Sequence, residues 1–298
     1  MLQRAAAEAA GAQHYPTGAL YVVATPIGNL ADITLRAMHV LALVDAVACE
    51  DTRHSAPLLR QLGIEGKALI ALHQHNEREA AAGVLLRLAR GERVAYVSDA
   101  GTPAISDPGA ALVAAVQAAG YRALPIPGAS SAVAALSVAG DATGGPFSFI
   151  GFMPPRSGER ALALKRLAVD PQTQVLFEAP HRIEALATAL AEACGARRLT
   201  VCRELTKQFE TVHSLPANEL PAWLAADVNR GRGEFVLVLH ALAVADDTGA
   251  APAHESTLRT LLAALPLKQA VALAAELTGA PRNALYERAL ALKNGTDA

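Results

Sequence analysis

Residues 94–109 read VAYVSDAGTPAISDPG, a short apolar run that leads into a loop of glycine, proline and small polar residues. The apolar run favours a buried β-strand, and the closing Pro-Gly is suited to the start of a helix over Gly109–Ala119. A plain turn from a strand into a helix does not need so elaborate a loop. Gly101 permits close approach of a ligand to the backbone, and Asp99 and Thr102 supply polar groups. We therefore expect an α/β unit with a ligand site in this loop.

The same alternation of strand and helix runs through the first half of the chain. Besides the run at Val94–Ser98, the expected strands are Leu20–Ala24, Ala46–Cys49, Ala68–Leu72 and Ala123–Ile126. The other expected helices are Leu35–Val44, Pro57–Leu62, Glu77–Arg90 and Ser130–Ala139. Such alternation is typical of a largely parallel sheet covered by helices.

Turn-forming residues at 141–146 break this pattern, and we place a domain boundary there. The expected strands after it are Phe147–Phe152, Val175–Glu178, Leu199–Cys202 and Phe235–His240, and the expected helices are Ser157–Leu167, His181–Cys194 and Asn218–Val228. The predicted divisions are a flexible N-terminal extension (1–18), an N-terminal α/β lobe (19–145), a C-terminal α/β lobe (146–240), a linker (241–256) and a helical tail resembling a helix-turn-helix (257–298).

Composition restricts the class of protein. A chain of 298 residues with 52% apolar and 18% charged residues is globular and long enough for two domains. A net charge of -2 excludes a uniformly basic protein, so any binding to a polyanion has to use local patches. Cys49, Cys194 and Cys202 form no CxxC pair, which argues against a disulfide framework or a metal site. The apolar runs are too short to span a membrane, and we expect a cytoplasmic protein.

Loops after other strands are also candidate ligand sites, because open α/β sheets bind ligands at the carboxyl ends of their strands. The first strand leads into Thr25–Leu30, and the last strand of the first half leads into Pro127–Ser131. An ordinary turn at Pro26 and helix capping by Ser130 and Ser131 remain alternatives. The GxGxxG and Gly-Lys-Ser/Thr patterns are absent, which counts against a dinucleotide fingerprint and a Walker loop.

Five motifs, most of them in these loops, follow one another in a fixed order along the chain. They are ATPIGNL (24–30), CEDTR (49–53), SDAGTP (98–103), PGASS (127–131) and FEAPHR (177–182). In this order, from about residue 19 to 240, they resemble the ribosomal RNA ribose methyltransferases of the tetrapyrrole-methylase superfamily. The tail is similar as well.

The resemblance implies a two-lobe tetrapyrrole-methylase-like fold that binds S-adenosyl-L-methionine in the cleft between its lobes, in a homodimer. It implies methylation of the ribose 2′-hydroxyl of a cytidine in small-subunit (16S) ribosomal RNA. The cofactor residues that it implies are Pro26, Asp99, Ala100, Gly101, Thr102, Ile105, Ser130, Ser131, Phe177, Leu205, Gly233 and Glu234.

One departure bears on the substrate. Tetrapyrrole-modifying relatives tend to carry a Gly-Gly-Asp-Pro turn, and Thr102 replaces the acid here. This favours the RNA branch over an enzyme that methylates a tetrapyrrole precursor or a protein side chain. A non-catalytic RNA-binding assembly factor is a further alternative, against which the intact loops at Pro26, Gly101 and Ser130 count.

A hydroxyl acceptor needs its proton removed, and several side chains near expected strand ends are candidate bases. They are Glu50, Asp51, His54, His73 and His75. Asp51 is the first choice, followed by Glu50 and His73. The alternative is that Glu50–Arg53 caps the following helix and pairs internally.

For the RNA, the expected contacts are basic side chains, namely Arg53, Arg156, Arg160, Lys165 and Arg182. The basic residues are few, and a solvated helical face explains those near Arg156 equally well. Because few phosphates can be neutralised, we expect an assembled small subunit to be a better substrate than free RNA.

Overall fold

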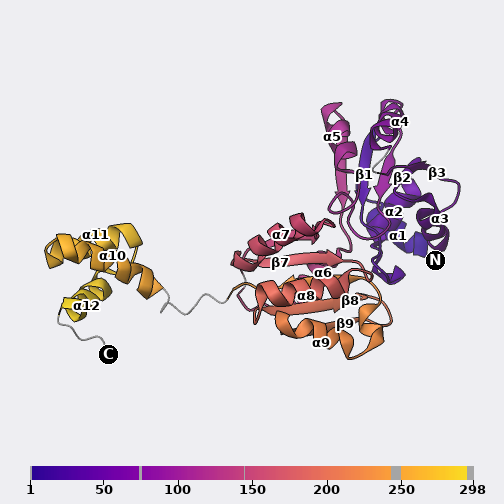
Figure 1. The fold of residues 1–298 in the computed structure, drawn as a ribbon. Coiled ribbons are helices and arrows are strands. Elements are labelled where there is room, and N and C mark those ends of the chain that lie inside the picture. Colours follow the sequence, from indigo (N-terminus) through magenta and orange to yellow (C-terminus); the bar gives the residue numbers. More distant parts are fainter. Residues whose placement is uncertain (1, 74–75, 144, 243–249, 294–298) are drawn as a thin grey trace. The chain divides into compact units, whose positions relative to one another are not determined.

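The structure, a computed structural model, describes residues 2–73, 76–143, 145–242 and 250–293. The chain forms one compact unit up to Ala241 and another from Leu242 onward (Figure 1). The first unit contains an N-terminal lobe and a C-terminal lobe, each built on its own sheet.

The N-terminal lobe is built on a sheet of parallel strands in the order β3-β2-β4-β1-β5. The strands are β1 (Ala19–Val23), β2 (Ala46–Cys49), β3 (Ala68–Ala71), β4 (Val94–Val97) and β5 (Arg122–Ile126). This confirms the expected parallel α/β lobe. The order places β4 between β1 and β2, so the loops that follow these strands meet at one edge of the sheet.

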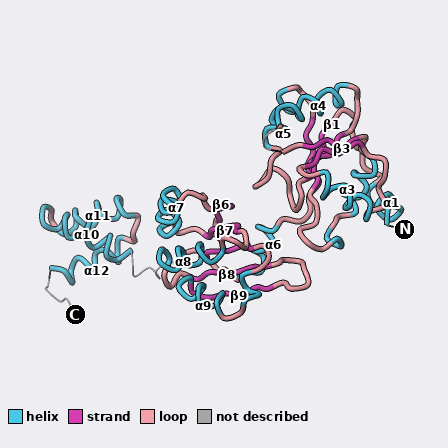
Figure 2. Tube along the Cα trace, turned by 45° about the vertical axis from the view of Figure 1, so that its right-hand side comes forward, coloured by secondary structure: helices cyan, strands magenta, loops and turns pink. Residues whose placement is uncertain are grey.

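Helices cover both faces of this sheet (Figure 2). They are α1 (Leu2–Ala10), α2 (Leu35–Leu43) and α3 (Thr52–Gln61) on one face and α4 (Glu77–Ala89) and α5 (Ala110–Ala118) on the other, with a 3-10 turn, η1 (Leu30–Asp32), after β1. Neighbouring residues of a strand point to opposite faces, so Tyr21 packs with α2 and Leu20 packs with α5.

The sheet of the C-terminal lobe is mixed, with the order β6-β7-β10-β8-β9. Its strands are β6 (Phe147–Phe152), β7 (Thr173–Glu178), β8 (Arg198–Arg203), β9 (Thr211–Pro216) and β10 (Phe235–Leu239). β6 and β7 are parallel, and the other neighbours are antiparallel. Strand β9 was not expected from the sequence, because it is largely polar and lies at the sheet edge, where Leu215 is its buried residue and the others are exposed or partly exposed.

Helices also lie on both faces of the second sheet. On one face lie α7 (Ser157–Val169), α8 (Ile183–Cys194) and α9 (Leu220–Ala225), with the 3-10 turns η2 (Ala217–Glu219) and η3 (Val228–Gly231) beside α9. The other face is covered by α6 (Ser131–Ala139), whose Ala132, Ala135 and Ala139 pack against Val175 and Val238. By packing, α6 therefore belongs to the C-terminal lobe, although the sequence analysis expects that lobe to begin at residue 146.

The structure also differs from several boundaries expected from the sequence. Residues 2–10, expected within a flexible extension, form α1, and the prediction is wrong for them because Ala6 and Ala10 are buried in contact with α2. Helix α3 begins at Thr52 rather than Pro57, because the Asp51 side chain caps it. The last part of the expected linker, from residue 250 onward, is helical.

The second unit is a bundle of helices, α10 (Ala250–Ala264), α11 (Leu267–Thr278) and α12 (Arg282–Lys293). Its core contains Leu258, Val271 and Leu285. Glu255 forms ion pairs with Arg259 and Arg288, and the latter pair joins α10 to α12. The described part of this unit confirms the helical tail. Among the described residues of the whole chain, no helix has the length and apolar character needed to cross a membrane.

Candidate functional site

Loops after β1 and β4 are held together at the edge of the first sheet. The backbone of Thr25 exchanges hydrogen bonds with that of Gly101, at N···O distances of 2.9 and 3.1 Å. Gly101 has a φ of +79°, a conformation that favours glycine. The Thr102 hydroxyl donates to the backbone oxygen of Ala129 at 3.0 Å, which ties in the loop after β5. The loops singled out in the sequence therefore lie together.

A cavity of about 310 Å³, here called the large cavity, lies against these loops and includes residues of both lobes. The N-terminal lobe contributes the loops at Ile27 and Ala100–Asp107, and the C-terminal lobe contributes the ends of β7 and β10. Of the expected cofactor residues, those that line it are Ala100, Gly101, Thr102, Ile105, Ser130, Ser131, Phe177, Leu205 and Glu234. Gly233 adjoins Glu234, and Pro26 and Asp99 line another cavity.

The lining of the large cavity fits S-adenosylmethionine. Its volume lies within the range of small-molecule sites, about 300–1,000 Å³. Apolar side chains such as Ile105 and Phe177 suit the flat adenine ring, and the hydroxyls of Ser130 and Ser131 suit its polar groups. The carboxyl group of Asp107 suits a cationic sulfonium or ammonium, whereas the lining carboxylates of Glu178 and Glu234 are paired with Arg182 and Lys207.

Several lining residues were not selected from the sequence, among them Ile27, Asp107, Glu178, Cys202 and Val236. Asp107 lies in the opening loop and Glu178 in the FEAPHR motif, so the motifs themselves contained this information. Cys202 lies within a strand and gave no signal. Burial raises the pKa of its thiol to about 12, so it stays protonated and acts as an apolar wall.

Glu178 is held in place by Arg182. The Glu178 side chain is 1% exposed, and its Oε1 lies 3.1 Å from Nε of Arg182. Arg182 also donates to the backbone oxygen of Met153 at 2.6 Å. These bonds give Arg182 a role in orienting a carboxylate of the cavity wall. Its expected contact with RNA stays a prediction.

Another cavity, of about 210 Å³ and here called the small cavity, lies in the N-terminal lobe. It is lined by Pro26, Gly28, Ser98, Asp99 and residues of α3 that include His54. The large and small cavities are thus lined by different residues of the same loops.

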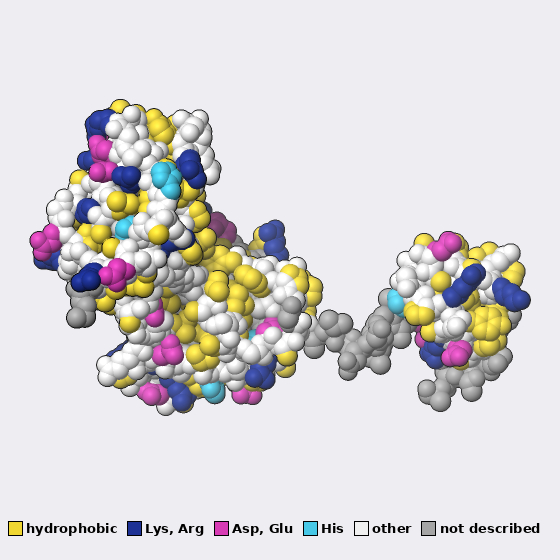
Figure 3. Space-filling view, turned by 180° about the vertical axis from the view of Figure 1, so that it is seen from behind, with side chains coloured by type: hydrophobic (Ala, Val, Ile, Leu, Met, Phe, Trp, Pro, Cys, Tyr) yellow, Lys and Arg dark blue, Asp and Glu magenta, His cyan; other side chains and the backbone are white. Residues whose placement is uncertain are grey.

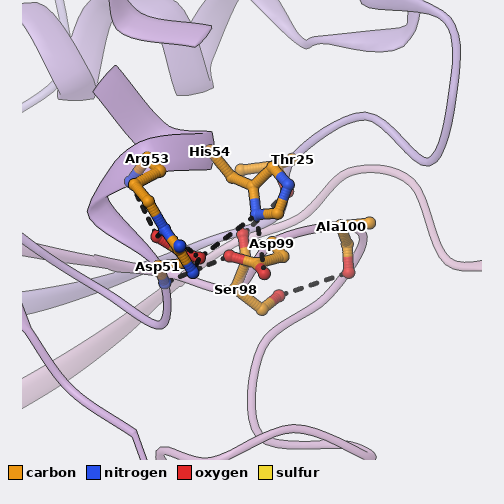
Figure 4. A network of polar contacts seen from close by, with 7 residues as sticks. All are labelled: Thr25, Asp51, Arg53, His54, Ser98, Asp99 and Ala100. Atoms are coloured by element: carbon orange, nitrogen blue, oxygen red, sulfur yellow. Dashed lines mark hydrogen bonds and ion pairs between the residues drawn. The ribbon is translucent and has the colours of Figure 1, made fainter. Parts of the chain in front are cut away.

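The first choice of base, Asp51, is bonded to Arg53 (Figure 4). Its carboxylate accepts hydrogen bonds from the backbone nitrogen of Arg53 at 2.8 Å and from Nη2 at 2.6 Å. Hydrogen bonds from the Arg53 side chain, followed by those from its backbone, lower the pKa of Asp51 to about 2. A carboxylate with so low a pKa is a weak proton acceptor near neutral pH. These contacts fit the alternative stated in the sequence analysis, in which Asp51 caps the following helix and pairs with Arg53.

Glu50 and His73 line neither cavity within the described residues. Burial, followed by the negative charges of Asp107 and Asp99, raises the pKa of Glu50. The backbone nitrogen of His73 donates to the side chain of Asn76 at 2.8 Å, in the loop before α4. Their catalytic roles stay predictions, and His75 lies outside the described residues.

The expected RNA contacts do not form one basic surface. Arg53 is exposed in the first turn of α3, while Arg156, Arg160 and Lys165 lie at α7, where Arg156 pairs with Glu159 at 3.1 Å. On the face drawn in Figure 3, Lys and Arg side chains are interspersed with Asp and Glu. Their contact with RNA stays a prediction. No group of three or more His, Cys, Asp or Glu residues suited to a metal ion occurs in the part of the chain that the structure describes.

Comparison with known families matches most of the chain. Residues 19–221 match the family described as Tetrapyrrole (Corrin/Porphyrin) Methylases, and residues 248–293 match the RsmI C-terminal HTH domain. A protein of Neisseria meningitidis serogroup A named ribosomal RNA small subunit methyltransferase I is 49% identical and matches over 93% of this chain and 94% of its own length. Proteins of the same name from Pseudomonas aeruginosa and Escherichia coli O157:H7 are 48% and 46% identical over 92% of this chain.

Solved structures share the fold of the lobes. Uroporphyrin-III-C-methyltransferase from Thermus thermophilus has a TM-score of 0.53 and 21% identity, and the match covers 74% of this chain and 94% of that one. The methyltransferase CobJ has a TM-score of 0.58 and 20% identity, and the match covers 76% of this chain and 95% of that one. At such low identity these likenesses concern the fold alone.

Proposed function

The chain belongs to the tetrapyrrole (corrin/porphyrin) methylases, and we propose that it methylates small-subunit ribosomal RNA at the 2′-hydroxyl of a cytidine ribose. The enzyme is a methyltransferase, and S-adenosylmethionine is its methyl donor. The RNA substrate is supported by one observation above the others. Relatives named for this RNA align with this chain over nearly all of both lengths, at 43–49% identity.

Within the proposed site, the residues of the large cavity hold the methyl donor. When bound, the sulfonium supplies an activated methyl group that leaves a neutral thioether behind. Exclusion of water and alignment of the reactants are the main contributions of the protein, since positioning alone can supply about 7–11 kcal/mol. The side chains of Ile105 and Phe177 cover apolar parts of the donor, and Asp107 offsets its positive charge.

The test is a binding measurement followed by a transfer assay. Titration calorimetry with S-adenosylmethionine should give saturable binding, and Phe177→Ala should weaken it. Methyl-labelled donor should then transfer its label to unmethylated small subunits, and nuclease mapping should find it on a cytidine ribose. Donor binding with transfer to a tetrapyrrole precursor or a protein instead of RNA would contradict the proposed substrate. Absence of donor binding would favour the non-catalytic alternative.

Two further parts of the proposal concern the oligomeric state and the location of the enzyme. We propose a homodimer, which the resemblance implies. Analytical ultracentrifugation of the purified protein tests this by measuring whether its mass is twice that of one chain. We also propose a cytoplasmic location, because small ribosomal subunits are assembled there. Fractionation of cells tests that location.

A further inference from the structure

The small cavity is adjacent to the large one through shared loops. After β1, Ile27 lines the large cavity, whereas Pro26 and Gly28 line the small one. After β4, Ala100–Thr102 line the large cavity, whereas Asp99 lines the small one. A molecule in the small cavity therefore lies next to the loops that hold the methyl donor.

His54 projects from α3 into the lining of the small cavity and is oriented by Asp99 (Figure 4). Its Nδ1 lies 3.1 Å from Oδ2 of Asp99. The other oxygen of Asp99 accepts a hydrogen bond from the backbone nitrogen of Asp51 at 3.2 Å, which fixes the carboxylate. An ionised carboxylate only accepts hydrogen bonds, so Nδ1 carries the proton and Nε2 of the neutral ring is an acceptor. This is the arrangement by which an aspartate orients a histidine base in hydrolase triads.

We propose that the small cavity receives the acceptor ribose and that Nε2 of His54 takes the proton of its 2′-hydroxyl. This inference rests on the proposed function. A bond forms between the ribose oxygen and the methyl carbon while the carbon–sulfur bond breaks, and the electron pair of the broken bond stays on sulfur. The hydroxyl proton passes to Nε2. His54 is 69% exposed, so the ring can return this proton to water.

Other groups near the small cavity are engaged elsewhere. Asp51 lies 3.8 Å from Nδ1 of His54, but Arg53 occupies its carboxylate. The stem of Lys207 lies against Gly28, and its ammonium is bound at 2.9 Å by Glu204 and at 3.0 Å by Glu234. Among the described residues lining the small cavity, Asp99 is the other ionisable group, and it acts through His54 as a positioning residue.

Charged groups face His54 from two elements. The carboxylates of Asp51 and Asp99 lie beside the ring, and the guanidinium of Arg53 is paired with Asp51. Only a neutral ring accepts a proton at Nε2, so the rate of methyl transfer should fall as the solution is made acidic.

The experiment measures single-turnover methyl transfer to unmethylated small subunits between pH 5 and 9, with donor affinity measured by calorimetry for every variant. His54→Gln should lower the rate at neutral pH about 100-fold or more and remove the loss of rate in acid that a histidine base causes. Its donor affinity should stay within about twofold of the unsubstituted enzyme, since His54 does not line the large cavity. Asp99→Asn should lower the rate less, because the ring keeps its accepting nitrogen but loses the carboxylate that orients it. His14→Gln, at an exposed histidine outside both cavities, is the matched control. It should change neither the rate of methyl transfer nor the donor affinity.

The outcomes separate the two proposals. Transfer by the unsubstituted enzyme together with a His54→Gln rate within about threefold of it, and an unchanged pH profile, would overturn the base assignment alone. If donor binds but small subunits are not labelled by the unsubstituted enzyme, both proposals are wrong. Loss of donor affinity in His54→Gln equal to its loss of rate would also overturn the assignment, because the residue would then act on the large cavity.

Discussion

The carboxylate of Asp51 is bound by its neighbour Arg53 at the start of α3, and this contact can be tested by titration. Arg53→Ala should raise the pKa of Asp51 from about 2 towards the ordinary value of about 3.9, because the guanidinium hydrogen bonds are the largest cause of the low value. Carbon-detected NMR of the side-chain carboxyl measures the midpoint. Since the folded-state pKa is depressed, the stabilising effect of the pair is present above about pH 4 and is lost as pH falls through about 2.

Arg60→Ala provides the control for this titration. Arg60 lies in the last turn of the same helix and should leave the Asp51 midpoint unchanged. An Asp51 midpoint that stayed near 2 in Arg53→Ala would show that the helix N-terminus, rather than the guanidinium, lowers the pKa.

At the scale of elements, helix α5 depends on the glycine at its N-cap. Gly109 has a φ of +119°, and a Cβ there would overlap with Cε1 of the buried Tyr96 ring. The Tyr96 hydroxyl donates to the backbone oxygen of Pro108, so the ring cannot turn away without losing that bond. Gly109→Ala should lower the free energy of unfolding by about 2–4 kcal/mol, measured by urea denaturation. It should also weaken donor binding, because the preceding loop lines the large cavity.

Gly120→Ala is a matched control for backbone strain. Gly120 has a φ of +82°, and a Cβ added there would meet no atom within 4 Å, so only conformational strain applies. Its cost should be about 1–2 kcal/mol, with donor affinity unchanged. Equal effects of the two substitutions would mean that contact with Tyr96 does not matter.

The junction between α6, β7 and β10 is held by one carboxylate, that of Asp141. It accepts hydrogen bonds from the Thr173 hydroxyl, from the backbone nitrogen of Ala241 at 2.9 Å, and from Thr143. Burial alone would raise the pKa of Asp141, but these hydrogen bonds outweigh it and lower the pKa well below the ordinary value. Asp141→Asn should lower the free energy of unfolding by about 2–4 kcal/mol at pH 7, because it places an amide donor against existing donors.

The effect of Asp141→Asn should depend on pH. The folded-state pKa is lowered, so the contribution of Asp141 is fully present above the ordinary aspartate pKa of about 3.9 and shrinks as pH falls below it. Urea denaturation at pH 7 and pH 3.5 measures the difference. Asp170→Asn is the control, because the Asp170 side chain accepts one backbone hydrogen bond, from Gln172. It should lower the free energy of unfolding by less than about 1.5 kcal/mol. A difference between wild type and Asp141→Asn that grew at low pH would contradict this explanation.

The elements also show which features could be predicted from the sequence. Alternating runs predicted the parallel sheet, and motif loops predicted most of the large cavity, because both depend on local residue order. The packing of α6 on the second sheet could not be predicted, since alanines at helical spacing fit either lobe. The contact between His54 and Asp99 joins residues 45 positions apart. It depends on β2 lying beside β4, which is a property of the sheet order.

At the scale of the whole molecule, the charge of the chain bears on which form of the RNA is the substrate. The net charge is -2, and several basic side chains are paired with acids, including Arg156 with Glu159 and Arg288 with Glu255. A chain without net positive charge attracts phosphates only through local groups of cations, and affinity for free RNA depends mainly on such contacts. We therefore predict that assembled small subunits, in which ribosomal proteins help to present the RNA, are methylated at least about 10-fold faster than naked small-subunit RNA at physiological salt.

Initial rates of label transfer to the two substrates at equal concentration measure this preference. Lower salt should reduce it, because the few available phosphate contacts strengthen as counterions are diluted. The paired substitution Arg160→Ala and Lys165→Ala should affect naked RNA more than subunits if α7 supplies these contacts. Equal rates on both substrates at physiological salt would mean that the enzyme recognises RNA structure without the ribosomal proteins. The scattered basic residues would then be sufficient for binding, contrary to the charge argument.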